Sequence, residues 1–174
     1  MTSQPPGRTA PGKRAAAARR RLLQRLDAAW NAFRDSYAGL SPAELLEPGV
    51  AGNWSVRDVI AHVTWWEEEA LKHLPLILDG GRPPRYSVTY GGIDAFNALK
   101  TGQTKGFSLP EVLNRQEEVH RRLVALVAEA PQDQLAGDTR FRRRLRLDTY
   151  GHYSKHAAAI RTWRWRRTAG PAGP

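Results

Sequence analysis

Three of the five histidines in this chain could bind one metal ion together. His152 and His156 are four residues apart, so a helix would place them one turn apart on the same face. His62 lies far earlier in the chain, on a second segment that also has helical periodicity. Two ligands from one helix and one from another would make a three-nitrogen site, with at least one coordination position open for water or substrate.

Each histidine also has a simpler explanation. A lone His62 would be a buried imidazole that is hydrogen-bonded to a carbonyl, and a His-x3-His pair can be part of a solvated helix face. The start of the last helix favours a metal role for His152, because the positive end of the helix dipole favours the neutral ring that metals bind. His73 and His120 have no partner pattern and are expected to be structural or exposed.

Two other side chains near these histidines are candidates for catalytic groups. Asp58 lies one turn before His62, although it could do no more than complete a helix cap. Tyr153 follows His152 and, with Trp66, is expected to line the wall of the site. The chain has no cysteine, so any thiol chemistry would need a thiol from outside the protein.

Helices with one apolar face must position these side chains. Apolar residues recur at steps of three and four, and three helix starts carry a serine with an acid three residues later, the pattern of a capping box. These boxes are Ser41–Glu44, Ser55–Asp58 and Ser108–Glu111. The long helices are expected over residues 12–38, 55–78, 109–130 and 148–167, with a short helix over 92–104.

These elements predict an all-α protein, an antiparallel four-helix bundle with a long connection between its second and third long helices. Residues 12–167 should form the bundle. Residues 1–11, rich in Pro, Gly and Ser or Thr, are expected to be a disordered basic tail, and residues 168–174 a disordered C-terminus.

The net charge of +10 is concentrated in three stretches, which hold 15 of the 27 basic residues. They are residues 1–21, Arg140–Arg146 and Arg161–Arg167. Such patches can hold a nucleic acid weakly through its phosphates, although a solvated surface explains them as well. The rest of the chain is mildly acidic.

The sequence gives no sign of a membrane partner. No apolar run approaches the roughly 20 residues needed to cross a bilayer, and the basic N-terminus lacks the apolar stretch of a secretory signal. We therefore expect a cytoplasmic protein without membrane contact. The sequence does not choose between a monomer and a homodimer.

Two motifs in the chain resemble a known family. Asn53–His62, with its Trp, acid and His, resembles the start of the second helix of DinB-like four-helix-bundle proteins. Gly151–Ile160 resembles their fourth helix. Within this superfamily, Tyr90–Asn97 and Ile160–Trp163 look most like the ClbS/DfsB branch. The resemblance covers roughly residues 20–167.

The resemblance implies a divalent metal held by His62, His152 and His156, and it allows two kinds of activity. Some DinB-like proteins are transferases or isomerases that use a low-molecular-weight thiol such as mycothiol or bacillithiol. ClbS/DfsB members are linked to self-protection against genotoxic metabolites, in one case by hydrolytic opening of a cyclopropane. The nitrogen ligands do not distinguish Zn, Ni, Fe or Co.

Our leading hypothesis is therefore a metal-binding bundle that acts on a reactive electrophilic small molecule in detoxification or self-resistance. The reaction would be hydrolysis or thiol addition, with a metal-bound water or thiol as nucleophile. The first alternative is a nucleic-acid-associated protein that uses its arginine-rich patches. The second is a non-catalytic bundle that sequesters a small molecule.

Overall fold

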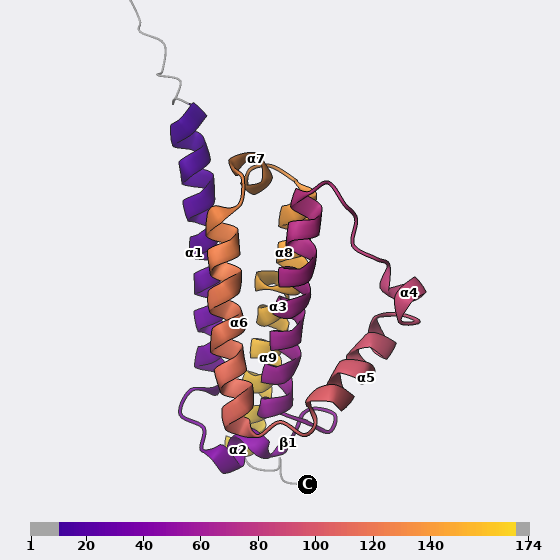
Figure 1. Ribbon diagram of the computed structural model, residues 1–174. Helices are drawn as coiled ribbons and strands as arrows, with labels where there is room; N and C mark the ends of the chain where they lie inside the picture. The colour runs from indigo at the N-terminus through magenta and orange to yellow at the C-terminus, as the bar shows by residue number, and fades with distance from the viewer. Residues whose placement is uncertain (1–10, 170–174) are drawn as a thin grey trace, which may run out of the picture.

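The apolar stripes of four long segments pack against one another as a four-helix bundle (Figure 1). The structure is a computed structural model and describes residues 11–169. The predicted all-α antiparallel bundle is confirmed. Its long helices are α1 (Pro11–Tyr37), α3 (Val56–Leu78), α6 (Leu109–Glu129) and α9 (Tyr150–Thr168).

Shorter elements connect the long helices. A two-stranded antiparallel hairpin, which the sequence analysis did not predict, leads into α3. The predicted tails, residues 1–11 and 168–174, lie outside the described residues except at their inner ends. The short elements are α2 (Pro42–Leu46), β1 (Pro48–Ala51), β2 (Trp54–Ser55), α4 (Tyr86–Thr89), α5 (Ile93–Thr104), α7 (Gln132–Leu135) and α8 (Arg140–Asp148).

All three predicted capping boxes are present, and they fix the starts of α2, α3 and α6. In the box that opens α3, the Ser55 N–H donates to Asp58 Oδ2 at 2.9 Å, and the Asp58 N–H donates to Ser55 Oγ at 3.2 Å. Each box satisfies backbone donors that a helix start otherwise leaves unpaired. The box at Ser55 therefore fixes the residue at which the helix that carries His62 begins.

The expected final helix, 148–167, is wrong at its start. Asp148 is not an N-cap but the last residue of α8, where its Oδ2 accepts a hydrogen bond from Arg144 Nε at 2.5 Å. The break between α8 and α9 falls at Thr149, with φ −130° and ψ −111°. A Cβ on Gly151 would lie 2.6 Å from the Arg146 carbonyl oxygen, so the tight junction requires glycine there.

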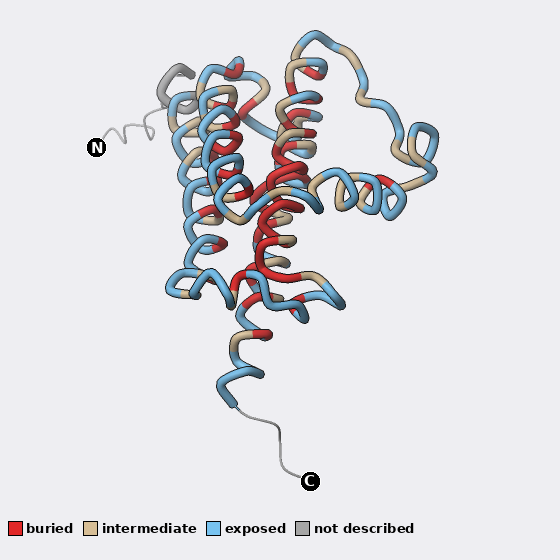
Figure 2. Tube along the Cα trace, turned by 60° about the horizontal axis from the view of Figure 1, so that its bottom comes forward, coloured by how far each residue is buried: buried red, intermediate tan, exposed pale blue. Residues whose placement is uncertain are grey.

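The core lies where α1 meets α9 and α3 meets α6, and the buried residues follow the inner faces of these helices (Figure 2). The long connection carries α4 and α5 on the outer side of α3 (Figure 1). Within residues 11–169, no helix combines the length and the apolar character that a membrane crossing requires.

Candidate metal centre

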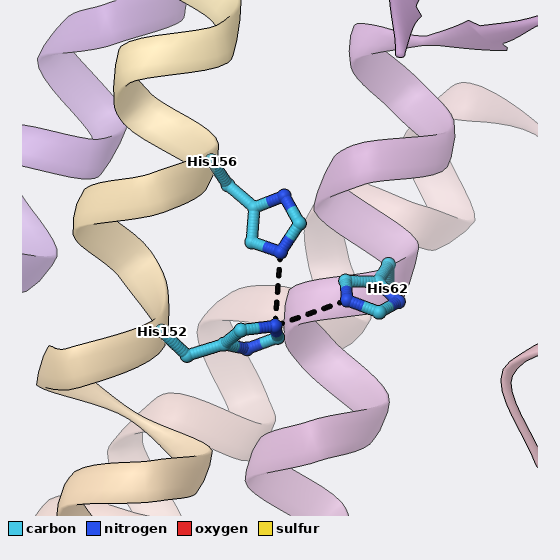
Figure 3. Close-up of side chains that lie close together, drawn as sticks. All are labelled: His62, His152 and His156. Carbon is cyan, nitrogen blue, oxygen red and sulfur yellow. Dashed lines mark hydrogen bonds between the residues drawn. The ribbon is translucent and has the colours of Figure 1, made fainter. Parts of the chain in front are cut away.

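The three predicted histidines converge between α3 and α9. His152 Nε2 lies 3.1 Å from His62 Nε2 and 2.9 Å from His156 Nε2 (Figure 3). One ring nitrogen from each residue lies within 4.8 Å of the other two. The helical spacing of His152 and His156 and the turn of α3 that carries His62 thus bring three imidazoles to one point.

The local structure of each helix sets these positions. His62 lies one turn after Asp58, in the second turn of the helix that the capping box opens. His152 lies at the start of α9, directly after the break at Thr149 and the close approach at Gly151. This break turns the chain so that both histidines of α9 face α3 (Figure 3).

Burial keeps all three rings neutral. Desolvation and the nearby rings of His156 and His152 lower the pKa of His62 to about 2. Desolvation, His156 and the charge of Lys155 lower the pKa of His152 to about 3. Desolvation, with the charge of Lys155, lowers the pKa of His156 to about 4. At neutral pH the three nitrogens are therefore free of the proton that would compete with a metal.

Aromatic rings surround the histidines. The His62 ring has Trp54, Trp65 and Trp66 around it, at centroid distances of 5.0, 4.8 and 6.4 Å. Trp66 also lies 5.9 Å from the His152 ring. These rings make an apolar wall, which keeps the nitrogens poorly hydrated.

The donor set fits a borderline divalent cation. Three neutral imidazoles are ligands that Zn²⁺, Ni²⁺ and Fe²⁺ all accept, and they leave coordination positions open. Among residues 11–169, the Nδ1 atoms of His62 and His152 are buried without a hydrogen-bond partner. No acid among the described residues therefore holds either ring, and the converging Nε2 atoms have only one another as partners.

Comparison with known proteins agrees with this architecture. The model of the DinB superfamily matches residues 25–159, which include all three histidines. The chain belongs to the DinB superfamily. Among solved structures, this DinB protein resembles the colibactin self-resistance protein ClbS, whose structure is a complex with double-stranded DNA. The TM-score is 0.71 at 17% identity, over 84% of this chain and 94% of that one. No curated protein matches the chain significantly.

The structure gives the two catalytic candidates other partners. Asp58 completes the Ser55 capping box and pairs with Arg57 Nη1 at 2.6 Å, and these bonds lower its pKa although partial burial opposes them. The Tyr153 hydroxyl donates to buried Glu67. Both groups therefore make contacts within the fold of this DinB protein, and their catalytic roles stay predictions. The predicted wall residue Trp66 does lie beside the histidines.

Sequence reasoning missed a second buried polar group in this DinB protein. Glu67 Oε1 accepts hydrogen bonds from Tyr153 and from His120 Nδ1, the latter at 2.8 Å. The His120 ring stacks on Trp30 at 3.7 Å. His120 was expected to be structural or exposed, and its buried ring agrees with a structural role. His73 is also buried and lies outside the metal centre. No local pattern links these residues, because they come from different helices.

The arginine-rich stretches of this DinB protein play different parts. Arg161 and Arg164 donate to carbonyls at the end of α1, and Arg167 pairs with acids in and after α2. By contrast, an open cleft of about 450 Å³ gathers side chains of the Arg140–Arg146 stretch next to α1. The residues lining it are Arg25, Gly137, Asp138, Arg142, Arg143, Arg146 and Tyr150.

Proposed function

We propose that this protein binds one divalent metal ion through His62, His152 and His156 and acts there on a reactive electrophilic small molecule. The convergence of three imidazole nitrogens within 4.8 Å, with His62 buried and His152 and His156 half-buried, carries the proposal. A role in detoxification or self-resistance is supported by the DinB fold that the chain shares with a self-resistance protein.

A divalent ion at this site would supply a Lewis acid, which lowers the pKa of a water molecule or of an incoming thiol. The protein's own residues do the rest. Trp54, Trp65 and Trp66 exclude water from one side of the site and offer an apolar surface to a small molecule. Since the chain has no cysteine, thiol addition would require an exogenous low-molecular-weight thiol.

Titration of the metal-free protein with Zn²⁺ or Ni²⁺ tests the metal site. We expect one tightly bound ion per chain, and at least about 100-fold weaker binding in His152→Ala, since His152 lies between the other two ligands. Ser154→Ala is the matched control, because Ser154 is exposed, uncharged and lies between the two α9 ligands in the sequence. Absence of a tight one-to-one complex, or unchanged affinity in His152→Ala, would refute the metal site.

Incubation of the metal-loaded protein with an electrophile such as an epoxide, with and without a thiol, tests the reaction. Mass spectrometry should find more than one molecule of product per protein chain, which shows turnover. No product should form after a chelator has removed the metal. Capture of one ligand per chain without turnover would instead support the sequestering bundle.

A nucleic-acid contact is the second candidate function, and the arginine-lined cleft favours it. Arg25 lies over the Tyr150 ring at 4.7 Å, and Asp138 is the one acid in the lining. Asp138 pairs with Arg143, which leaves the charges of Arg25, Arg142 and Arg146 without an acid among the described residues. This arrangement fits phosphate oxygens, and the fold neighbour ClbS is seen with double-stranded DNA.

Duplex-DNA binding measured against salt tests this second function. Affinity should fall steeply with salt concentration, and Arg146→Ala should lower both the affinity and the salt slope. Arg167→Ala is the control, because Arg167 is already paired with Glu44 and Glu47. Equal losses in the two variants, or no retention of DNA at low salt, would refute the function.

A further inference from the structure

A buried polar cluster lies next to the metal centre, on the side facing the connection between α3 and α6. Its central atom is the Tyr86 hydroxyl, which donates to Glu69 Oε2 at 2.6 Å and accepts from Arg144 Nη2 at 2.9 Å. Arg144 Nε in turn donates to Asp148. Three elements, α3, α4 and α8, thus meet in one network. We call Glu69, Tyr86, Arg144 and Asp148 the latch.

The latch and the metal centre occupy consecutive turns of the same interface. On α3, His62, Trp66 and Glu69 follow one another at steps of four and three, so they share one face. Trp66 separates the two groups: its ring lies 5.9 Å from His152 on one side and 5.6 Å from Tyr86 on the other. Whatever moves Tyr86 therefore changes the support of a ring that lines the metal centre.

Besides the latch, the segment that carries Tyr86 is attached to the bundle near its two ends and through Phe96; near its start, Arg140 Nη1 donates to the Gly81 carbonyl at 3.1 Å. Residues 79–107, including α4 and α5, stand on the outer side of α3 (Figure 1), and Val88 is 81% exposed. Phe96, the one residue of the segment that is fully buried, packs 5.3 Å from Trp66 and 4.8 Å from Tyr86. Arg57 holds the far end through the carbonyls of Thr104, Lys105 and Phe107.

Two features suit the segment to opening as a unit. Gly80, Gly91 and Gly92 have positive φ values and lie on either side of α4, where they can absorb a backbone rotation. The latch also keeps its central donor, because burial and the Glu69 acceptor raise the pKa of Tyr86 and its hydroxyl stays protonated. Losing that donor would leave Glu69 buried with its hydrogen bond unmade.

We propose that residues 79–107 form a lid over the Trp66 side of the metal centre, and that the Tyr86 latch holds this lid closed. Opening breaks the bonds of Tyr86 to Glu69 and Arg144 and withdraws Tyr86 and Phe96 from Trp66. Trp66 then loses its outer support, so its ring can turn aside and let a small molecule reach the histidines from this side. The lid does not depend on the bound metal, but its part in admitting ligands rests on the proposed function.

Hydrogen exchange of the metal-free protein tests the lid. Tyr86→Phe keeps the ring and removes the hydroxyl, and we expect exchange over residues 86–104 to become at least about tenfold faster, the size expected for a lost bond to a carboxylate. Tyr90→Phe is the matched control, because Tyr90 belongs to the same segment and packs 4.9 Å from Phe96. Exchange in Tyr86→Phe within twofold of this control would overturn the proposal.

Peptides from α6 report whether the variant has lost stability as a whole. If the α6 peptides also exchange faster in Tyr86→Phe, the lid is tested with Glu69→Gln in its place. This variant keeps the shape of the acceptor side chain and removes its charge. It should speed exchange in the lid severalfold and leave α6 unchanged; equal effects on both would overturn the proposal.

Release of Zn²⁺ to an excess of chelator tests the coupling to the metal centre. Release should be at least about fivefold faster in Tyr86→Phe than in Tyr90→Phe, while the equilibrium affinities stay within about twofold. Equal release rates would overturn the gating role. A protein that binds no zinc would refute the proposed function, and the exchange data alone would then decide on the lid.

Discussion

Two buried polar groups begin five residues apart on α3, at His62 and at Glu67, and they differ in what surrounds them. Glu67 Oε1 accepts from both His120 and Tyr153, so these donors satisfy that oxygen of the carboxyl. Around His62 the neighbours are two further imidazoles and aromatic rings. Among the described residues, the three facing Nε2 atoms have only one another as partners and can share a cation, whereas Glu67 Oε1 already has two donors.

This difference separates a structural role from a binding role. A buried acid with bound donors stabilises one packing of the core and costs stability when it is broken. A cluster of neutral nitrogens contributes little to the free energy of unfolding until it binds a cation or a proton. The four predictions below test whether the two groups differ in this way, from the largest expected effect to the smallest.

The largest effect should follow from breaking the Glu67 group. His120→Ala leaves the buried carboxyl of Glu67 without one donor, and removing one member of a buried pair costs about 3 kcal/mol of unfolding free energy. Urea denaturation measures this loss, and the zinc affinity should stay within about twofold of the wild type. The double variant Glu67→Leu/His120→Leu should recover much of the stability. A single-variant loss below about 1 kcal/mol would contradict a structural role.

Zinc should stabilise the protein through the other group. At a free zinc concentration 100 times the dissociation constant, binding to the folded state alone raises the unfolding free energy by about 2.7 kcal/mol. Urea denaturation with and without zinc measures the gain. The gain should vanish in His62→Ala and persist in His120→Ala. A gain of equal size in both variants would place the metal elsewhere.

A third prediction concerns the junction that positions His152. In Gly151→Ala the new methyl group meets the Arg146 carbonyl at 2.6 Å, and such overpacking costs about 1–3 kcal/mol. Relief of this clash would displace the start of α9, which carries His152, so the zinc affinity should also fall. Gly102→Ala is the control, since Gly102 is also helical and a Cβ there meets nothing within 4 Å. Unchanged stability in Gly151→Ala would contradict the tight junction.

The smallest effect is a pH dependence of the metal-free protein. Burial lowers the pKa of His156 to about 4, while the unfolded chain keeps the ordinary value near 6.5. The unfolded state therefore binds more protons below pH 6.5, so this contribution is present above that pH and is lost as the pH falls toward 4. His156→Gln should lessen the loss between pH 7 and 5 by roughly 1–2 kcal/mol. Identical pH profiles by urea denaturation would contradict the burial of a neutral ring.

The burial of Glu67 gives the opposite sign. Desolvation raises the pKa of this carboxyl, although its hydrogen bonds oppose the shift. The folded state therefore keeps a proton to higher pH than the unfolded chain, and the stability from this group falls as the pH rises above the ordinary value of 4.5. The stability contributions of the histidine cluster and of Glu67 thus change with pH in opposite directions.

The sequence predicted the parts of the structure that depend on neighbours along the chain. Three serine–acid boxes fixed the starts of α2, α3 and α6, because both partners lie within one helical turn. The His152–His156 pair followed from helical spacing in the same way. His62 was added because its own segment also has helical periodicity, and the resemblance to DinB-like proteins supported that addition.

The remaining features depend on contacts that no local pattern encodes. Asp148 has the residue type of an N-cap, but its pairing with Arg144 places it at the end of α8. Glu67 and His120 lie 53 residues apart, and Tyr86 meets Arg144 over 58 residues. Catalytic roles for Asp58 and Tyr153 were predicted from their positions near the histidines along the chain and stay predictions. Tyr153 donates to Glu67, which lies 86 residues away.

The separation of the metal ligands along the chain has a consequence for connectivity. His62 and His152 are 90 residues apart, so an ion held by both would close a ring that includes α4 to α8. Closing a long ring removes conformational freedom from the unfolded chain, as a disulfide does, and this chain has no cysteine to form one. A reversible cross-link would then take the place of a covalent one. Mechanical extension of the metal-loaded chain should stop short by the length of that ring until the ion is released.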